Sequence, residues 1–588
     1  MADSSFVWLL RPLKGAVHAF LALSAVCLII PSALAATPRE ELLRLVPDDV
    51  AFCVVLQDLR DHAARLQKSP FLEQFSKTPL AKFLESSKDL EKLFFLDTIL
   101  KENLGVNSSK LLEDIFGDAA VFAYRPGPSG QPETEQGLFL VRSRDEKALS
   151  DLIERLNAVQ KQSGDVKEIS PRIHKGVTYQ RRLEKKGENF YWQRGPLLAV
   201  STQEAMLHQV IDLDRSERSA KEPFLANQFR QLGADKQLLA FWLNPRAFQE
   251  EIKRKAVGNS AEATGLRTYL SYWQALEGIA LTVDLQDDLV ITVAARARPD
   301  GLPASARRFF AEAGKPTELW RRIPSDALLG AAGRVDVLAF AEAVAEFLTP
   351  EMRQTAKQKL DRSVSAAWDK DLLKDILPCL GPDWAFYVAF PPDNDKNWFP
   401  HMVAAYRVTP GSKDPPIDKT ILEGLTSLAR LGVLAYNAQA DSEKEGTLQL
   451  KTTKQDGVLV YYLTGSSRFP PGFQPAWGLR DEFLILASSP DAIGQFRSKD
   501  DKALSTKTGE IPILKLSITE TCRFLKVRRE PLVAFLAEKN QLAKEVVAQQ
   551  LDALVAVLQI FDWVEVTQLP GEGQAVLTLR VKTVKPLK

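Results

Sequence analysis

The chain has 588 residues, of which 45% are hydrophobic and 26% are charged, and its formal net charge is +1. A chain of this length exceeds the size at which a single hydrophobic core usually stops growing, so more than one domain is expected. Because the charges nearly cancel, the sequence excludes attraction to nucleic acid or to an anionic membrane through net charge.

Residues 1–35 have the features of a secretory signal peptide. Arg11 and Lys14 give a positively charged start, Phe20–Ile30 is a compact apolar segment, and Ala33-Leu34-Ala35 supplies small residues for cleavage. We therefore expect an extracytoplasmic protein, periplasmic or secreted, with no transmembrane segment after cleavage. The alternative is an uncleaved anchor, because the apolar part is nearly long enough to span a bilayer.

Three cysteines remain after the predicted cleavage site: Cys53, Cys379 and Cys522. An odd number of widely spaced cysteines does not indicate a disulfide framework, even in an oxidising compartment. Cys53 lies in the apolar run AFCVVL, which is typical of a small buried side chain. The fold is therefore expected to depend on its hydrophobic core.

The first half alternates short apolar strands with amphipathic helices. Ser201-x-x-Glu204 predicts a capping box at the start of a helix, which would give Glu204 a structural role. The predicted strands are Val50–Leu56, Ala119–Arg125, Gly137–Val141, Val177–Leu183, Glu188–Gln193, Leu197–Ser201, Leu238–Leu243, Ile279–Leu285 and Leu289–Ala295. The main predicted helices are Leu59–Leu104 with two proline breaks, Asp145–Gln162, Pro245–Lys255 and Thr264–Leu276.

From Ile323 the same order of elements recurs. Val46-Pro47 and Ile323-Pro324 each lead through an Asp into an apolar strand, and Gly176-Val177 is answered by Gly457-Val458. The predicted strands are Ala327–Ala332, Asp383–Phe390, His401–Val408, Gly457–Leu463, Phe483–Ser488, Ile511–Leu516, Trp563–Gln568 and Gln574–Val581. The predicted helices lie within Val335–Leu377, at Ile417–Leu431 and in one long helix, Pro531–Phe561.

Repetition of the markers in one order indicates an internal duplication. We predict an α+β protein with two tandem homologous halves, residues 36–298 and 319–588, joined by a junction at residues 299–318. Hairpin connections dominate, so each half is expected to be a mainly antiparallel sheet with packed helices.

The exported start, the Pro-x-Asp opening before an apolar strand, the Gly-Val-x-Tyr strand and the strand–Ser–helix return together resemble a family of bacterial extracytoplasmic proteins. That family is of planctomycete type, is described only as a domain of unknown function and shows an internal duplication. The resemblance implies an envelope or secreted location and brings no activity, cofactor or site with it. Gly333-Arg334 departs from the pattern, because it stands where the opening strand of the second half would continue.

The sequence contains none of the motifs on which a catalytic residue could be assigned. Histidines of the mature chain are scattered singly, so we predict no metal site and no cofactor. Glu204 and His208 lie four residues apart and would make half a metal site, although the capping box explains Glu204 equally well. Neither a Gly-x-Ser-x-Gly elbow nor a phosphate-binding loop occurs.

One loop in the second half, Asp393–Pro400, carries Trp398 and Phe399, whereas its counterpart in the first half is polar. Exposed aromatic residues on loops anchor partners, so these two are candidate binding residues. The alternative is that they begin the next strand and pack in the core.

Three functional hypotheses follow. The first is an exported, non-enzymatic binding or scaffold module for an envelope protein. The second is a carrier of an apolar ligand, suggested by apolar stripes on the long helices. The third is a hydrolase with a dispersed, loop-built site.

Overall fold

A computed structural model describes residues 37–584, apart from short gaps. The gaps are residues 79–80, 82–96, 99, 129–130, 132–133, 186, 217–222, 259, 286–287, 369, 392–396, 410–415, 440–445 and 498–508. The predicted signal peptide therefore lies outside the described residues, as does most of the second part of the predicted helical region Leu59–Leu104.

Along the described residues, runs of consecutive strands are separated by helices. The strands are β1 (Phe52–Gln57), β2 (Ala119–Arg125), β3 (Gln136–Arg142), β4 (Val166–His174), β5 (Val177–Glu184), β6 (Gly187–Arg194), β7 (Leu197–Ser201), β8 (Leu239–Leu243), β9 (Leu276–Leu285), β10 (Asp288–Ala297), β11 (Leu329–Arg334), β12 (Leu380–Ala389), β13 (His401–Val408), β14 (Gln449–Gln455), β15 (Val458–Thr464), β16 (Ala476–Arg480), β17 (Phe483–Ala487), β18 (Ile511–Ser517), β19 (Phe561–Gly571) and β20 (Gln574–Thr583). The α-helices are α2 (Pro38–Leu43), α3 (Leu59–Gln67), α4 (Pro70–Ser76), α7 (Ser108–Lys110), α8 (Glu146–Gln162), α9 (Glu204–Arg215), α10 (Phe224–Gln231), α11 (Gln249–Lys255), α12 (Ala261–Ala275), α13 (Ala304–Ala313), α14 (Val337–Glu346), α15 (Pro350–Trp368), α16 (Ile417–Gln439), α18 (Pro490–Gln495), α19 (Ile518–Val527), α20 (Arg529–Asn540) and α21 (Lys544–Leu558).

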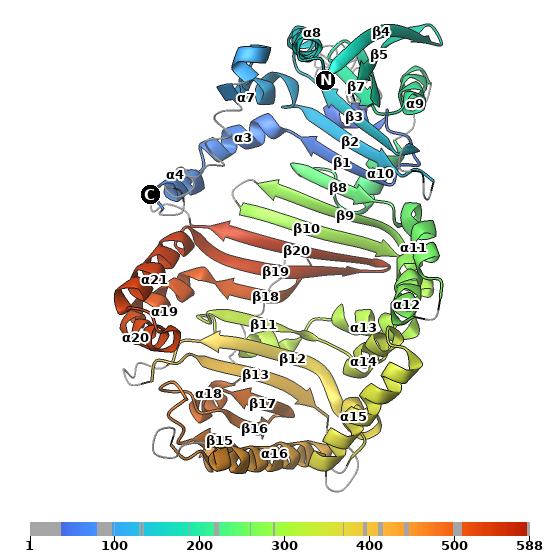
Figure 1. The fold of residues 1–588 in the computed structure, drawn as a ribbon. Helices are drawn as coiled ribbons and strands as arrows, with labels where there is room; N and C mark the ends of the chain where they lie inside the picture. The colour runs from blue at the N-terminus through green and yellow to red at the C-terminus, as the bar shows by residue number, and fades with distance from the viewer. Residues whose placement is uncertain are drawn as a thin grey trace, which may run out of the picture.

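The strands of both halves form one continuous antiparallel sheet (Figure 1). This confirms the predicted α+β class with an antiparallel sheet and packed helices, but the strands join into a single sheet rather than one sheet per half. In space the order is β4-β5-β6-β7-β3-β2-β1-β8-β9-β10-β20-β19-β18-β11-β12-β13-β17-β16-β15-β14.

This order is palindromic. Counted from one end, each strand of the first half has the same place as the strand numbered ten higher has when counted from the other end. Its centre is the β10–β20 pair, in which Thr292 lies opposite Thr578 with the two hydroxyl oxygens 3.4 Å apart. Thr282 on β9 and Thr567 on β19 extend the row on either side. Four threonines thus cross the middle of the sheet on one face, where cross-strand hydroxyl pairs are favourable.

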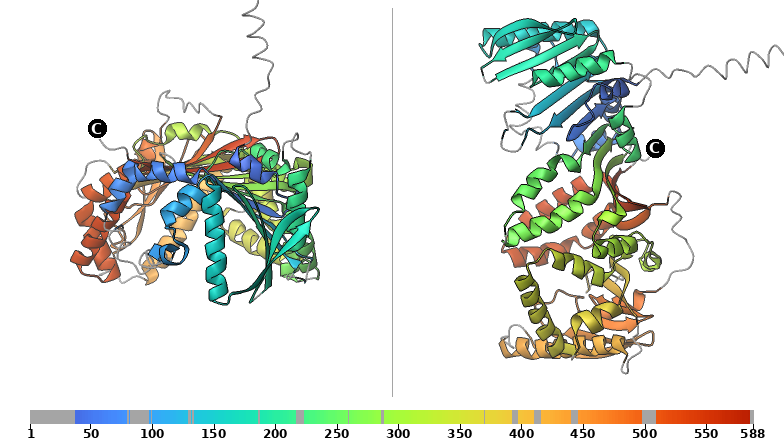
Figure 2. Two further views of the ribbon diagram at one scale, coloured as in Figure 1. Left: turned by 90° about the horizontal axis from the view of Figure 1, so that it is seen from above. Right: turned by 90° about the vertical axis from the view of Figure 1, so that its right-hand side faces the viewer.

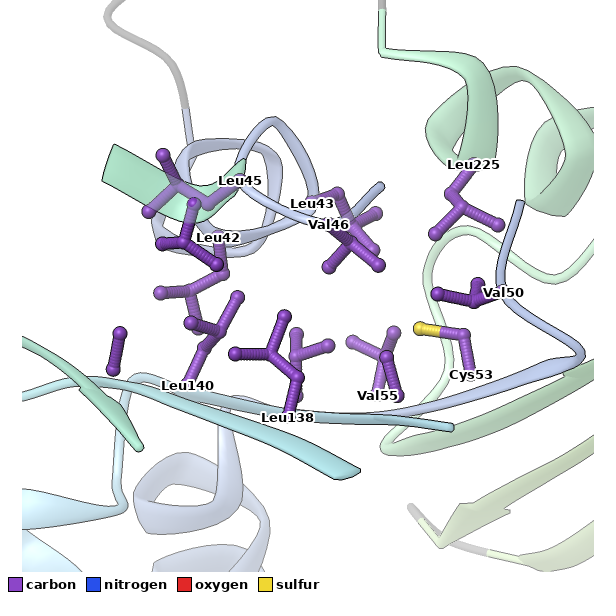
Figure 3. Close-up of a cluster of buried hydrophobic side chains, with 14 of the residues drawn as sticks. Leu42, Leu43, Leu45, Val46, Val50, Cys53, Val55, Leu138, Leu140 and Leu225 are labelled. Atoms are coloured by element: carbon purple, nitrogen blue, oxygen red, sulfur yellow. The ribbon is translucent and has the colours of Figure 1, made fainter. Parts of the chain in front are cut away.

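That threonine face, called the back face here, carries the main core. In the first half α2, α9 and α10 cover it, and Leu42, Leu138, Leu207 and Phe229 are essentially inaccessible to solvent. Figure 3 shows the side chains of α2 meeting those of β1 and β3. In the second half a smaller cluster packs α18 and the following Phe496 on the same face.

The opposite, front face is covered near its two ends and also over β18 and β19, where α19 and α21 pack on Leu516 and Val564. Around Leu149 and Ile153, α8 packs on β2, β3 and β7. At the other end α15 and α16 pack over β12, β13 and β17 through Trp368 and Ile421. Further helices stand along both long sides of the sheet, α19–α21 on one side and α11–α15 on the other (Figures 1 and 2).

Several sequence-based assignments differ from the structure. The strand β16 was not predicted, and Gly333-Arg334 continues β11 rather than departing from the strand. Two further differences have local reasons. The long helix Pro531–Phe561 is in fact α20 and α21, because Gln541 adopts the left-handed conformation (φ 55°) and ends α20. The terminal strands β4 and β14 were missed, since each carries polar and charged residues such as Lys167 and Lys454 rather than apolar alternation. Lysine and proline are typical of edge strands, which must avoid pairing with other chains.

Candidate functional site on the open front face

The registers of the central strands place one row of apolar side chains on the front face. Val54 pairs with both Phe122 and Phe241. Phe241 pairs with Leu281, Leu281 with Val293, and Val293 with Leu577. Directly paired residues project from the same side of a sheet, so this row runs from β2 to β20 without a break.

The second half continues the row to β17 through the same kind of pairing. We call this surface the open face and define it by Phe52, Val54, Phe122, Phe241, Leu281, Val283, Ile291, Val293, Leu577, Leu579, Val566, Leu514, Ala331, Phe386, Ala404 and Leu486.

Burial on the central strands is inverted with respect to polarity. Leu281 is 36% exposed on the open face, whereas its neighbour Thr282 is 3% exposed on the back face. On β20, which pairs with β10, Leu577 is 47% exposed, whereas Thr567 on the neighbouring β19 is 5% exposed. Leucine is usually the buried residue and threonine the exposed one, so the open face is a surface with apolar groups left in contact with water.

The open face offers no charge to a ligand. On strands β2 to β17, none of the described side chains that share this face belongs to Asp, Glu, Lys or Arg. Its polar members are Tyr124, Tyr406, Gln568 and Thr583, together with the indole N–H of Trp384. The backbone groups of these strands are engaged in the ladders of the sheet, so the surface presents almost only hydrocarbon.

At the first-half end of the open face, aromatic rings pack side by side. The ring centroid of Phe52 lies 4.9 Å from that of Tyr124, 5.8 Å from that of Phe241 and 5.9 Å from that of Phe122. Such contacts stabilise aromatic pairs beyond their buried area. The rings are thereby held in place as a preformed apolar surface.

The two candidate binding residues of the sequence lie elsewhere. Trp398 is only 7% exposed, and its ring lies 5.3 Å from that of Phe535 on α20. Phe399 packs on Phe473 with ring centroids 4.8 Å apart. Part of their loop, residues 392–396, is outside the described residues. The burial of Trp398 favours the alternative in which these rings belong to the core, and their partner-binding role stays a prediction.

Glu204 and His208 belong to a polar cluster between α9 and the β4–β5 hairpin. Tyr179 donates a hydrogen bond to Glu204 (2.5 Å), and its oxygen lies 3.0 Å from His208 Nε2. The His208 ring stacks on His174 with centroids 3.9 Å apart, and His174 Nε2 lies 3.0 Å from a carboxylate oxygen of Asp212. The predicted capping box is absent, since the Ser201 hydroxyl accepts from the Gln203 N–H and α9 has no side-chain cap.

Burial and the adjacent His174 lower the pKa of His208, so its ring is favoured in the neutral form. Burial and the hydrogen bond to Glu204 raise the pKa of Tyr179 to about 12. Opposite charges are paired here, as in the contact of Lys175 Nζ with Asp212 at 2.9 Å. The cluster therefore acts as a cross-link that holds α9 on the hairpin.

A second polar site lines a pocket of about 950 Å³ at the junction and β11–β13. Asp383 accepts from the Thr317 hydroxyl at 2.8 Å and pairs with Arg334 at 3.3 Å and Arg407 at 3.1 Å. Glu312 binds Arg334 in turn, at 2.6 Å. The charges neutralise one another, so this pocket is a weaker candidate than the open face.

Sequence reasoning missed the open face, although its signal was present. Ile279–Leu285 and Leu289–Ala295 alternate large apolar residues with small or polar ones, a pattern that predicts one apolar face. The sequence does not reveal which helices cover that face, and coverage decides whether it is core or surface.

Within the described residues, no three His, Cys, Asp or Glu side chains gather where a metal ion would fit. None of the described helices combines the length and the apolar character that crossing a membrane requires. Comparison with known proteins found no matching family model, no matching curated protein and no matching solved structure.

Proposed function

We propose that this protein is an exported binding protein that carries lipid, with the acyl chains lying against the open face. The observation that supports it most is the exposure of Leu281, Val293 and Leu577 on an uncharged sheet surface. Covering such a surface gains about 25 cal/mol per Å² of apolar area removed from water. Among the three functional hypotheses drawn from the sequence, this supports the carrier of an apolar ligand.

An acyl chain fits this surface better than a polypeptide in extended conformation. An extended peptide laid on the open face would leave its N–H and C=O groups without partners, because the face offers almost no hydrogen-bonding side chain. Each unpaired group would lose free energy on leaving water. An acyl chain has no polar group to desolvate.

A second copy of the protein fits less well. A second copy would meet the helices that stand along both sides of the sheet before it reached the strands (Figure 2). An external apolar ligand of small width meets no such obstacle.

The test uses phosphatidylcholine vesicles and the mature protein. The protein is incubated with vesicles and reisolated by gel filtration, and its lipid is extracted and quantified. We expect the wild type to retain phospholipid and Leu577→Asp to retain about tenfold less, since a buried carboxylate would have to be desolvated. Leu542→Asp is the matched control: Leu542 is 45% exposed and lies in the turn between α20 and α21, in none of the strands.

Absence of lipid on the wild type, or equal loading of Leu577→Asp, would contradict the proposal. Capture of a protein with an apolar helix in place of lipid would instead support the scaffold hypothesis.

Mass spectrometry of the exported chain should find Ala36 as its first residue, and an intact Met1 in the cytoplasm would contradict export.

We also propose that the two halves arose by duplication of one unit. The palindromic strand order supports this, with the self-paired position Thr292–Thr578 at its centre. A matching turn supports it too: Lys175-Gly176 and Asp456-Gly457 both have positive φ and join equivalent strands. An experimental structure in which β1–β10 fail to superpose on β11–β20 would contradict the duplication.

A further inference from the structure

The β11–β12 ladder ends on a buried pair of opposite charges, whereas the equivalent ladder of the first half ends on uncharged residues. Each ladder contains six residue pairs, and the last is Arg334 with Asp383 on β11–β12 but Gln57 with Ala119 on β1–β2. Asp383 is only 5% exposed. Apolar residues of similar volume often stabilise a fold as well as a buried ion pair does, or better. The charges of the second half therefore indicate a role other than stability.

These charges line a pocket on the back face of the sheet. Arg334 and Asp383 project to the back, because their strand neighbours Gly333 and Trp384 face the front. The pocket has a volume of about 950 Å³, which lies within the range of small-molecule sites. Its charged lining residues are Glu318, Arg321, Arg334, Asp383, Arg407 and Glu510.

The charges of the lining balance, and the most buried of them are already paired. Asp383 lies 3.3 Å from Arg334 and 3.1 Å from Arg407. An anionic ligand would have to compete with Asp383 for these arginines, and a cationic ligand would have to compete with the arginines for Asp383. Either exchange would leave a buried charge without its partner, which is costly. A hydroxyl group can accept from a guanidinium N–H or donate to a carboxylate while the ion pairs stay in place. The lining therefore favours an uncharged ligand that is rich in hydroxyl groups.

Trp320 adds a flat apolar surface to the same pocket. Its ring is partly exposed, and its Nε1–H donates to the carbonyl oxygen of Pro512 at 2.8 Å, which fixes the orientation of the indole. At the matching distance before β1 the first half has Leu43, which is 1% exposed and offers no such surface. A sugar ring carries C–H groups on its faces and hydroxyl groups around its edge. It can therefore use the indole and the polar lining together.

We propose that this pocket binds a neutral oligosaccharide, with Trp320 against the face of one sugar ring and the charged side chains at the hydroxyl groups. The pocket and the open face lie on opposite sides of the sheet. The inference therefore does not depend on lipid carriage.

The test is saturation-transfer NMR of the mature protein with the neutral sugars maltotriose, cellotriose, mannotriose and N-acetylated chitotriose, and with trigalacturonate as the charged comparison. We expect at least one neutral sugar to bind, and calorimetry then gives its Kd. Trp320→Leu, which places the first-half residue type here, should raise this Kd about tenfold or more, since aromatic anchors dominate binding sites. Arg321→Ala changes an exposed residue of the lining, so it should keep the fold and raise the Kd by a smaller factor.

Trp273→Leu is the matched control. Trp273 on α12 is also partly exposed and donates its Nε1–H to a proline carbonyl, that of Pro245 at 2.6 Å, but it does not line the pocket. This variant should bind the sugar as the wild type does. Failure of every neutral sugar to bind, tighter binding of trigalacturonate, or an unchanged Kd in either pocket variant would overturn the inference. Equal losses in Trp320→Leu and Trp273→Leu would overturn it too, because they would trace the effect to the fold rather than to the pocket.

Discussion

Replacing Trp398 by alanine should destabilise the second half strongly. Trp398 is only 7% exposed, and its ring centroid lies 5.3 Å from that of Phe535 on α20 and 6.0 Å from that of Phe399. Truncation of a buried Trp to Ala costs about 3–5 kcal/mol, from lost transfer free energy and from the cavity left behind. Each kcal/mol lowers Tm by about 2–4 °C in a unit of 150–250 residues and by less in a larger one. The second half, residues 319–588, is larger, so we expect a fall near the lower end of the range of about 6–20 °C.

Thermal unfolding followed by circular dichroism or calorimetry measures this shift. The control is Leu434→Ala on α16, because Leu434 is 67% exposed and its truncation should change stability by about 0.5 kcal/mol or less. A Tm of Trp398→Ala within about 2 °C of the wild type would refute the packing argument. Loss of partner capture at unchanged Tm would instead support the binding role predicted from the sequence.

Three further predictions concern other parts of the fold. Gly176→Ala and Gly457→Ala should each lower the free energy of unfolding by about 1–2 kcal/mol in urea titrations, because both glycines have φ above 80°, where a residue with a Cβ is strained. The space around a new Cβ is open at both positions, so the loss would come from the backbone alone. Clearly unequal losses would argue against equivalent turns. Burial lowers the pKa of His401 below its unfolded value of about 6.5, so stability is fully present above that pH and declines as pH falls toward the folded-state pKa. The urea midpoint should therefore fall between pH 7.5 and 5, and less steeply in His401→Asn; an identical decline in the variant would contradict this. Burial raises the pKa of the Cys53 thiol to about 12, so maleimide at pH 8 should label Cys53 only after denaturation, and rapid labelling of the native chain would show that the core around it is open.

Much of the local structure could be predicted because it depends on local patterns. The strands Ala119–Arg125, Leu197–Ser201 and His401–Val408 were predicted with their observed bounds, since apolar runs between turn residues define them. The helix Asp145–Gln162 differs by one residue, because Asp145 is its N-cap and accepts from the Ala148 N–H at 3.0 Å. These features need no knowledge of the rest of the chain.

What could not be predicted depends on long-range pairing. β10 and β20 are almost 300 residues apart, and nothing within Leu289–Ala295 or Gln574–Val581 specifies that these two strands pair. Exposure of the open face depends in turn on where α8, α16 and the flanking helices pack. The candidate pair Trp398-Phe399 was chosen on the assumption that loop aromatics are exposed, and the contact with Phe535 was not visible in the sequence.

Photo-crosslinking from the centre of the sheet tests lipid carriage on the open face most directly. A benzophenone amino acid is placed at Val293, on the open face, or at its neighbour Thr292, on the back face, and the protein is irradiated with phosphatidylcholine vesicles. If lipid lies on the open face, intact-mass measurement will show lipid adducts from position 293 and few or none from position 292. Equal labelling at both positions, or an absence of adducts at position 293, would contradict lipid binding on this face.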